Sequence, residues 1–192
     1  MRDFGLRKQV LICVALAVFA SSCSLHVRGA GSASWETKLV AETARHAQEQ
    51  VSLGKYKMAL ETYSTAYDKY HLRGLRNGYA KLGEQILSAS DTAYQRRDFA
   101  EAGSAYRVLF ESGITTRDFA GSLSFDDDYL SRHIKACSKT LMEIGLMKYR
   151  EEKLDEAIAI WKQVLAFDLD NKNVKSAIDT ATVQLQQLKN IR

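Results

Sequence analysis

Apolar residues recur every three or four positions from Trp35 to the C-terminus, and no sustained run alternates apolar with polar residues. This spacing places the apolar side chains on one face of an α-helix, whereas a half-buried strand needs a period of two. The 192-residue chain also lacks proline, the residue that most strongly interrupts a helix interior. We therefore expect an all-α fold over residues 35–192.

The clearest helical pattern lies between Leu141 and Asn171. A first apolar face contains Leu141, Ile144 and Tyr149, and a second contains Leu154, Ala157, Ile158, Trp161 and Leu165. The polar residues 150–153 separate the two faces and are typical of a short turn. The pattern predicts two antiparallel helices joined as a hairpin.

This hairpin resembles a tetratricopeptide repeat. Gly145 lies 12 residues before Ala157, and the family keeps small residues at these two positions because the paired helices touch there. Trp161 follows as a large residue that fills the gap to the neighbouring helix. Leu169 departs from the pattern, because the family usually has proline there to stop the second helix.

Two weaker copies share this phasing, with Ala47 and Ala59 as the small residues of the first and Ser90 and Ala102 as those of the second. The intervals from Ala59 to Ala102 and from Ala102 to Ala157 are 43 and 55 residues, longer than the about 34 of a regular array. The excess in the second interval falls at residues 113–128, which we expect to form a long loop or an extension of the hairpin. The resemblance implies about three irregularly spaced antiparallel hairpins, and a plain helical bundle is the alternative.

A last apolar stripe follows Asn171 and contains Val174, Ile178, Ala181, Leu185 and Leu188. In solenoid proteins, a terminal helix of this kind covers the open apolar edge of the last repeat. We therefore expect a C-terminal capping helix. A coiled-coil contact with a partner is the alternative, although two heptads are too few to indicate one.

The first 22 residues have the pattern of a secretory signal peptide. Three cations and one anion precede an uninterrupted run of 11 apolar residues, which is too short to span a bilayer as a stable anchor. The run ends in Ala20-Ser21-Ser22-Cys23, which resembles the lipobox of bacterial lipoproteins, although leucine is usual in place of Ala20. The resemblance implies cleavage before Cys23 and acylation of its thiol. A plain secreted protein is the alternative, since Ala20 and Ser22 also suit an ordinary signal peptidase.

The segment 23–34 is rich in small residues and is expected to be a flexible tether between the lipid anchor and the helical domain. Ser24 is not the aspartate that retains many lipoproteins in the inner membrane, so the resemblance favours the outer membrane. The formal net charge of +4 falls to +2 without the leader, which carries three cations and one anion. So balanced a charge argues against a nucleic-acid partner.

No cluster of catalytic or metal-binding residues stands out. The four histidines, His26, His46, His71 and His133, are scattered and have no ligand partner at a helical spacing. Ser52 and Lys55 fit a motif of penicillin-binding enzymes, but the partner motifs are missing and we expect a turn there. The sequence therefore predicts a protein that is not an enzyme and binds no cofactor or metal.

Two further groups favour structural roles. The three aspartates 126–128 suit the N-terminus of a helix better than a calcium loop, because adjacent carboxylates point in different directions. Cys137 lies in a predicted helix, where a lone cysteine is usually a small core residue.

The inner faces of the first helices of stacked hairpins form a groove that binds peptides or partner helices. The residues phased toward this groove are Glu84, Leu87, Asp91, Tyr94 and Gln95 in the middle hairpin and Lys139, Met142, Leu146, Tyr149 and Arg150 in the last one. Aromatic, methionine and arginine side chains are enriched at contact hot spots. Leu87, Leu146 and Tyr149 have core packing as an alternative role.

These features predict an outer-membrane lipoprotein that acts as a scaffold or adaptor for an envelope machine, with an envelope protein or peptide as its partner. By architecture it resembles pilotins of secretins, assembly factors of outer-membrane proteins and adaptors of cell-wall enzymes. An envelope enzyme, or a lipid-handling subunit of one, is the alternative from a different class.

Overall fold

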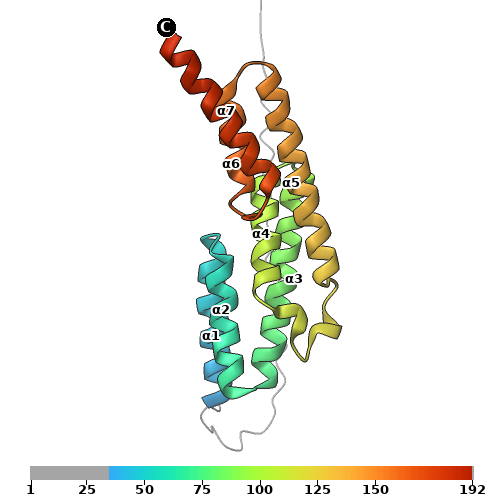
Figure 1. The fold of residues 1–192 in the computed structure, drawn as a ribbon. Helices are drawn as coiled ribbons and strands as arrows, with labels where there is room; N and C mark the ends of the chain where they lie inside the picture. Colours follow the sequence, from blue (N-terminus) through green and yellow to red (C-terminus); the bar gives the residue numbers. More distant parts are fainter. Residues whose placement is uncertain (1–34, 192) are drawn as a thin grey trace, which may run out of the picture. The chain divides into compact units, whose positions relative to one another are not determined.

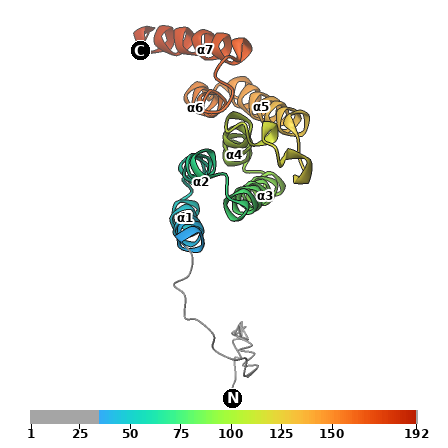
Figure 2. The same ribbon diagram turned by 90° about the horizontal axis from the view of Figure 1, so that it is seen from below.

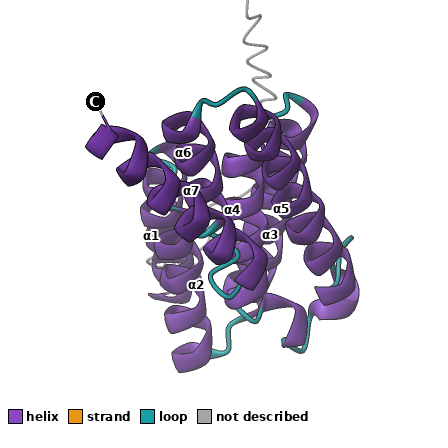
Figure 3. Cartoon of the chain, turned by 45° about the horizontal axis from the view of Figure 1, so that its top comes forward, coloured by secondary structure: helices purple, strands orange, loops and turns teal. Residues whose placement is uncertain are grey.

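The computed structural model describes residues 35–191. The predicted signal peptide, Cys23 and the tether therefore lie outside the described residues. Within the described range the chain forms seven α-helices and two 3-10 turns and contains no strand, which confirms the all-α prediction (Figure 3). The elements are α1 (Trp35–Ser52), α2 (Tyr56–Tyr70), α3 (Arg73–Gln95), α4 (Phe99–Glu111), η1 (Ile114–Thr116), η2 (Ala120–Ser122), α5 (Asp127–Arg150), α6 (Leu154–Val164) and α7 (Lys172–Ile191).

Each α-helix packs against the next one along the chain, from α1 with α2 to α6 with α7. Further contacts join α1 with α3, α2 with α4, and α4 with α6. The helices are seen mostly end-on in Figure 2, where they follow one another in chain order. There α7 is seen nearly side-on, so it runs at an angle to α1, α2 and α4, and Figure 1 shows the same tilt.

One apolar core joins all seven helices. The residues that phase the three predicted hairpins are small and are all buried: Ala47, Ala59, Ser90, Ala102, Gly145 and Ala157. Short turns at residues 53–55, 96–98 and 151–153 separate the helices of each pair, and the sequence had placed the last of them at 150–153. The sequence thus predicted the helical content and the burial of these small residues, but not the close approaches of Gly78 to Tyr63 and of Gly103 to Phe167.

The closest approach within the last pair is between α5 and α6 at Gly145. A Cβ atom placed on Gly145 would overlap the indole ring of Trp161, which is 2% exposed. The indole Nε1 of Trp161 donates a hydrogen bond to the carbonyl oxygen of Met142 at 3.2 Å. Glycine is therefore required at this position for α6 to lie against α5.

Side-chain caps fix the starts of three helices. Asp98 accepts a hydrogen bond from the backbone N–H of Glu101 at 3.1 Å and begins α4. Asp126 accepts from the N–H of Tyr129 at 2.7 Å and begins α5, which confirms the predicted role of the aspartates 126–128. Asn171 accepts from the N–H of Val174 at 3.1 Å, so α7 begins where the sequence placed its cap. Each cap satisfies a backbone donor that has no partner within the helix.

The predicted loop at 113–128 is folded back onto the preceding helices and includes η1 and η2. Phe119 is 2% exposed, and its ring lies 5.8 Å from that of Tyr67 on α2 and 5.4 Å from that of Tyr79 on α3. Ile114 packs against Gly83 of α3, where a Cβ atom would come within 2.6 Å of it. The segment therefore belongs to the core and is not an open loop.

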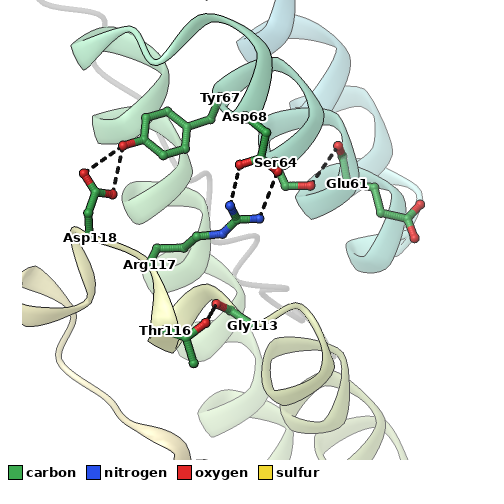
Figure 4. A network of polar contacts seen from close by, with 8 residues as sticks. All are labelled: Glu61, Ser64, Tyr67, Asp68, Gly113, Thr116, Arg117 and Asp118. Carbon is green, nitrogen blue, oxygen red and sulfur yellow. Dashed lines mark hydrogen bonds and ion pairs between the residues drawn. The ribbon is translucent and has the colours of Figure 1, made fainter.

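Polar contacts hold the same segment to α2 (Figure 4). The hydroxyl of Tyr67 donates to the carboxylate of Asp118 at 2.8 Å, and Arg117 forms an ion pair with Asp68. The hydrogen bond to Asp118 raises the pKa of Tyr67, and the hydrogen bond to Asp68 raises that of Arg117. The segment from Gly113 to Asp118 is thus fixed by both apolar and charged contacts.

Candidate functional site

The residues predicted to line a groove on the middle hairpin are largely engaged within the domain. Leu87 is 7% exposed and lies in the core, so its alternative role as a packing residue is confirmed. Both carboxylate oxygens of Glu84 accept hydrogen bonds from Ser124, one from the backbone N–H and one from the hydroxyl, each at 2.6 Å. Gln95 is exposed at the end of α3. The folded-back segment 113–126 therefore occupies part of this face.

A polar and aromatic cluster joins α3, α4 and α5 around Asp91. The hydroxyls of Tyr106 and Tyr129 donate to Asp91 at 2.6 and 3.1 Å. Burial raises the pKa of both tyrosines, and the carboxylate of Asp91 raises it further, so both remain neutral donors. The ring of His133 stacks on Tyr129, with 4.1 Å between centroids, and contacts Tyr94 edge-on. Asp91 and Tyr94 thus hold three helices together.

The residues predicted on the last hairpin have a different environment. Met142, Leu146 and Tyr149 on α5 line an open depression of about 330 Å³, and Trp161 of α6 is also part of its lining. Leu146 is 40% exposed, whereas Met142 and Tyr149 are half-buried. The structure therefore brings together three of the five predicted residues of this helix. We call this depression the α5–α7 groove.

The opposite wall of the groove comes from α7, for which the sequence predicted a capping role, with a coiled-coil contact as the alternative. This wall consists of small or polar residues: Asn173, Ser176, Ala177 and Thr180. They recur at steps of 3, 1 and 3, which is the spacing of one helix face beside the buried stripe of Val174 and Ala181. The spacing of this second stripe can be recognised in the sequence. Its position opposite the α5 residues of the groove cannot.

The α7 stripe itself is only partly a cap. Val174 and Ala181 are fully buried against the domain, and Ile178 and Leu185 are half-buried. Leu188 remains 48% exposed, because the last turns of α7 extend past its neighbours (Figure 1). The first half of the stripe is therefore buried against the domain, as a capping helix requires.

The remaining two predicted residues lie at the rim of the last hairpin. Lys139 is exposed and lies 4.0 Å from Glu143 on the same helix, a surface pair of small energetic value. Arg150 is exposed at the end of α5. The groove itself thus combines an apolar wall and a half-buried aromatic with small and polar residues, which is the composition of a protein contact site.

The groups that suggested catalysis have structural contacts. The hydroxyl of Ser52 donates to the backbone carbonyl of Glu49 at 2.8 Å at the end of α1. Cys137 is fully buried, and burial raises the pKa of its thiol to about 12. Among residues 35–191, no three histidine, cysteine or acidic side chains lie close enough to bind a metal ion. Within the same range no helix is both long and apolar enough to cross a bilayer.

Comparison of the chain with family models, curated proteins and solved structures found no match. A functional assignment therefore rests on the residues, contacts and charges of this chain itself.

Proposed function

We propose that this protein is a lipid-anchored adaptor of the bacterial envelope, attached to the outer membrane at Cys23 and facing the periplasm. Its helical domain binds a segment of another envelope protein in the α5–α7 groove. The observation that carries the proposal is the convergence of Met142, Leu146 and Tyr149 on one open depression opposite the small residues of α7.

The tetratricopeptide type of fold is part of this proposal. It is supported by the burial of a small residue at each of the six phased positions and by the overlap that any side chain at Gly145 would make with Trp161. In this interpretation α1, α3 and α5 are the first helices of three hairpins, and α7 stands where the first helix of a fourth would be. The α5–α7 groove then lies between two successive first helices, which is where such arrays bind peptides.

The composition of the groove favours a short amphipathic segment as its occupant. A partner side chain placed against Leu146 and Met142 would remove apolar surface from water, at about 25 cal/mol per Å² buried. The small residues Ser176 and Ala177 let the backbone of a partner approach α7 closely, and the hydroxyl of Ser176 is exposed for hydrogen bonding. Arg150, which is exposed next to Tyr149 at the end of α5, suits an acidic residue in the partner.

Acylation of Cys23 is tested by mass spectrometry of the N-terminal peptide of the mature protein. The expected peptide begins at Cys23 and carries a diacylglyceryl group and, where the host adds it, a third acyl chain. An unmodified Cys23, or a mature chain that starts at another residue, contradicts the anchor.

Partner binding is tested by truncating a groove residue together with its exposed neighbour in the sequence. Tyr149→Ala with Arg150→Ala should weaken capture of the partner by more than about tenfold, because central aromatic and arginine anchors commonly contribute more than about 1 kcal/mol each. Lys162→Ala with Gln163→Ala is the matched control, since both residues are exposed on α6 outside the groove. Circular dichroism confirms that each variant is folded. Equal capture by the groove variant and the wild type contradicts this site, and loss in the control locates binding elsewhere.

Turnover separates the adaptor from the enzyme alternative. An adaptor binds its partner without consuming cell-wall or lipid substrates, whereas the purified mature chain of an envelope enzyme hydrolyses or transfers them. The same preparation is therefore incubated with peptidoglycan fragments and with phospholipid, and release of product contradicts the adaptor.

A further inference from the structure

An exposed pair of aromatic rings lies where the described chain begins. Trp35, the first residue of α1, is 59% exposed, and Tyr70, the last residue of α2, is 36% exposed. The two ring centroids are 5.7 Å apart and the ring planes are inclined by 56°. Trp161, by contrast, is 2% exposed in the core. Trp35 therefore contacts Tyr70 but leaves more than half of its side chain exposed, unlike a core tryptophan.

Cationic residues surround this pair. The ammonium group of Lys69 lies 5.0 Å from the centroid of the Tyr70 ring, and both Lys38 and Arg73 are exposed in the first turns of α1 and α3. The start of α1, the end of α2 and the start of α3 lie at the same end of the helices (Figure 1). Trp35, Lys38, Lys69, Tyr70 and Arg73 are called the Trp35 patch.

Few anions balance these three cations. Glu36 is the acidic residue in the first turn of α1. Asp68, next to Lys69, is paired with Arg117, and Asp118 accepts from Tyr67 and lies 3.9 Å from Arg76. The patch therefore presents aromatic rings within an excess of positive charge.

The position of the patch along the chain links it to the membrane. Eleven residues lie between Cys23 and Trp35. Even a fully extended segment of that length spans at most about 40 Å, so an acylated Cys23 keeps the patch close to the bilayer surface. Tryptophan and tyrosine concentrate at the headgroup level of membranes, because each combines an apolar ring with a polar N–H or O–H.

We propose that the Trp35 patch binds the surface of an anionic lipid bilayer and so orients the helical domain on the membrane. This inference rests on the proposed anchor at Cys23, which brings the patch to the lipid. Each lysine or arginine near an anionic surface raises partition by about fivefold, since its contribution is about 1 kcal/mol. The Trp35 and Tyr70 rings add contact with the headgroup region.

In the test, the chain from Cys23 onward is coupled to a maleimide lipid in vesicles. Vesicles of phosphatidylcholine alone are compared with vesicles that also contain phosphatidylglycerol. This chain retains all described helices, and Cys137 is buried with a raised pKa, so maleimide reacts at Cys23. Brominated lipids then quench tryptophan fluorescence at the depth of the interface. We expect quenching of Trp35 on phosphatidylglycerol vesicles and none of Trp161. The Trp35→Phe variant, which retains Trp161 alone, gives the baseline.

A second measurement uses the uncoupled Cys23→Ser chain. Lys69→Glu with Arg73→Glu should lower its partition onto phosphatidylglycerol vesicles at least tenfold. Lys162→Glu with Lys189→Glu is the matched control, because it makes the same charge change at exposed residues of α6 and α7 and should alter partition much less. Absence of Trp35 quenching, or equal loss in both pairs of variants, overturns the proposal.

These outcomes do not depend on the proposed function. Coupling through maleimide replaces cellular acylation, so an unmodified Cys23 in cells leaves the vesicle result intact. The groove variants at Tyr149 and Arg150 likewise lie outside the patch. A second copy of this chain is the other occupant that an aromatic patch could have, and sedimentation without lipid tests for it. A dimer that Trp35→Ala dissociates assigns the patch to a second copy and overturns lipid binding.

Discussion

Replacement of Gly145 by alanine tests the tightest helix contact in the domain. A Cβ atom at this position would lie 2.5 Å from Cδ1 and 2.7 Å from Cε2 of the Trp161 indole. Ordinary separation between such atoms is about 3.5 Å, so the indole must move by about 1 Å. Because Trp161 is 2% exposed, packed neighbours hold the indole on most sides, and its displacement disturbs the contact between α5 and α6.

Three contributions set the magnitude. Overpacking of a well-packed core costs about 1 to 3 kcal/mol, and displacement of the indole also weakens its hydrogen bond to the Met142 carbonyl, worth about 1 kcal/mol. Alanine in place of glycine within a helix contributes about 1 kcal/mol in the opposite direction. We therefore expect Gly145→Ala to lower the free energy of unfolding by about 1 to 3 kcal/mol.

Urea unfolding followed by circular dichroism measures this change. Gly121→Ala is the control, because a Cβ atom at Gly121 meets no atom within 4 Å and should leave stability unchanged or slightly higher. In the double variant Gly145→Ala with Trp161→Phe, the smaller ring should relieve part of the overlap, so the two changes are not additive. If Gly145→Ala is as stable as Gly121→Ala, the α5–α6 contact does not form as described.

Three further outcomes are expected from the same unfolding measurements. Asp126→Ala removes the cap of α5 and should lower the free energy of unfolding by about 1 kcal/mol. Asp128→Ala is the control, and an equally large loss of stability in this variant would argue against the cap. Tyr67→Phe removes the hydrogen bond to Asp118 and should cost about 0.5 to 1.5 kcal/mol, and no loss would mean that this hydrogen bond does not stabilise the folded-back segment. Burial raises the pKa of the Cys137 thiol to about 12 from an ordinary value of 9.0, so the stability linked to this thiol is fully present below pH 9.0 and is lost as the pH rises toward about 12. Cys137→Ala should therefore flatten the alkaline decline of the unfolding free energy between these values, and an unchanged slope would contradict the burial of the thiol as its cause.

Local signals in the sequence were sufficient for the helical content and for the small buried residues of the last hairpin. Gly145 and Ala157 were identified from the spacing of small residues, and both lie at buried positions of paired helices. The aspartates 126–128 indicated a helix start because a carboxylate next to unpaired backbone N–H groups is stabilising there. These predictions depend on residues within a few turns of one another, and such contacts are set by helix geometry.

Contacts between distant segments were not predictable in the same way. Phe119 packs on Tyr67 and Tyr79 from a segment without periodicity, and nothing near Phe119 in the sequence specifies those partners. The same segment supplies Ser124, which engages Glu84 and removes it from the predicted groove. The α7 wall of the groove was missed because the angle at which α7 crosses α5 depends on how Val174 and Ala181 pack, and periodicity does not encode that angle.

Photo-crosslinking in cells that express the full precursor tests the adaptor account most directly. A photoreactive phenylalanine analogue replaces Leu146, which is 40% exposed in the α5–α7 groove, or Gln163, which is exposed on α6. The account predicts a single envelope protein crosslinked from position 146, absent from position 163, and lost when Tyr149→Ala and Arg150→Ala are added. Equal crosslinking from both positions, or a partner crosslinked from position 163 alone, would contradict a binding site in this groove.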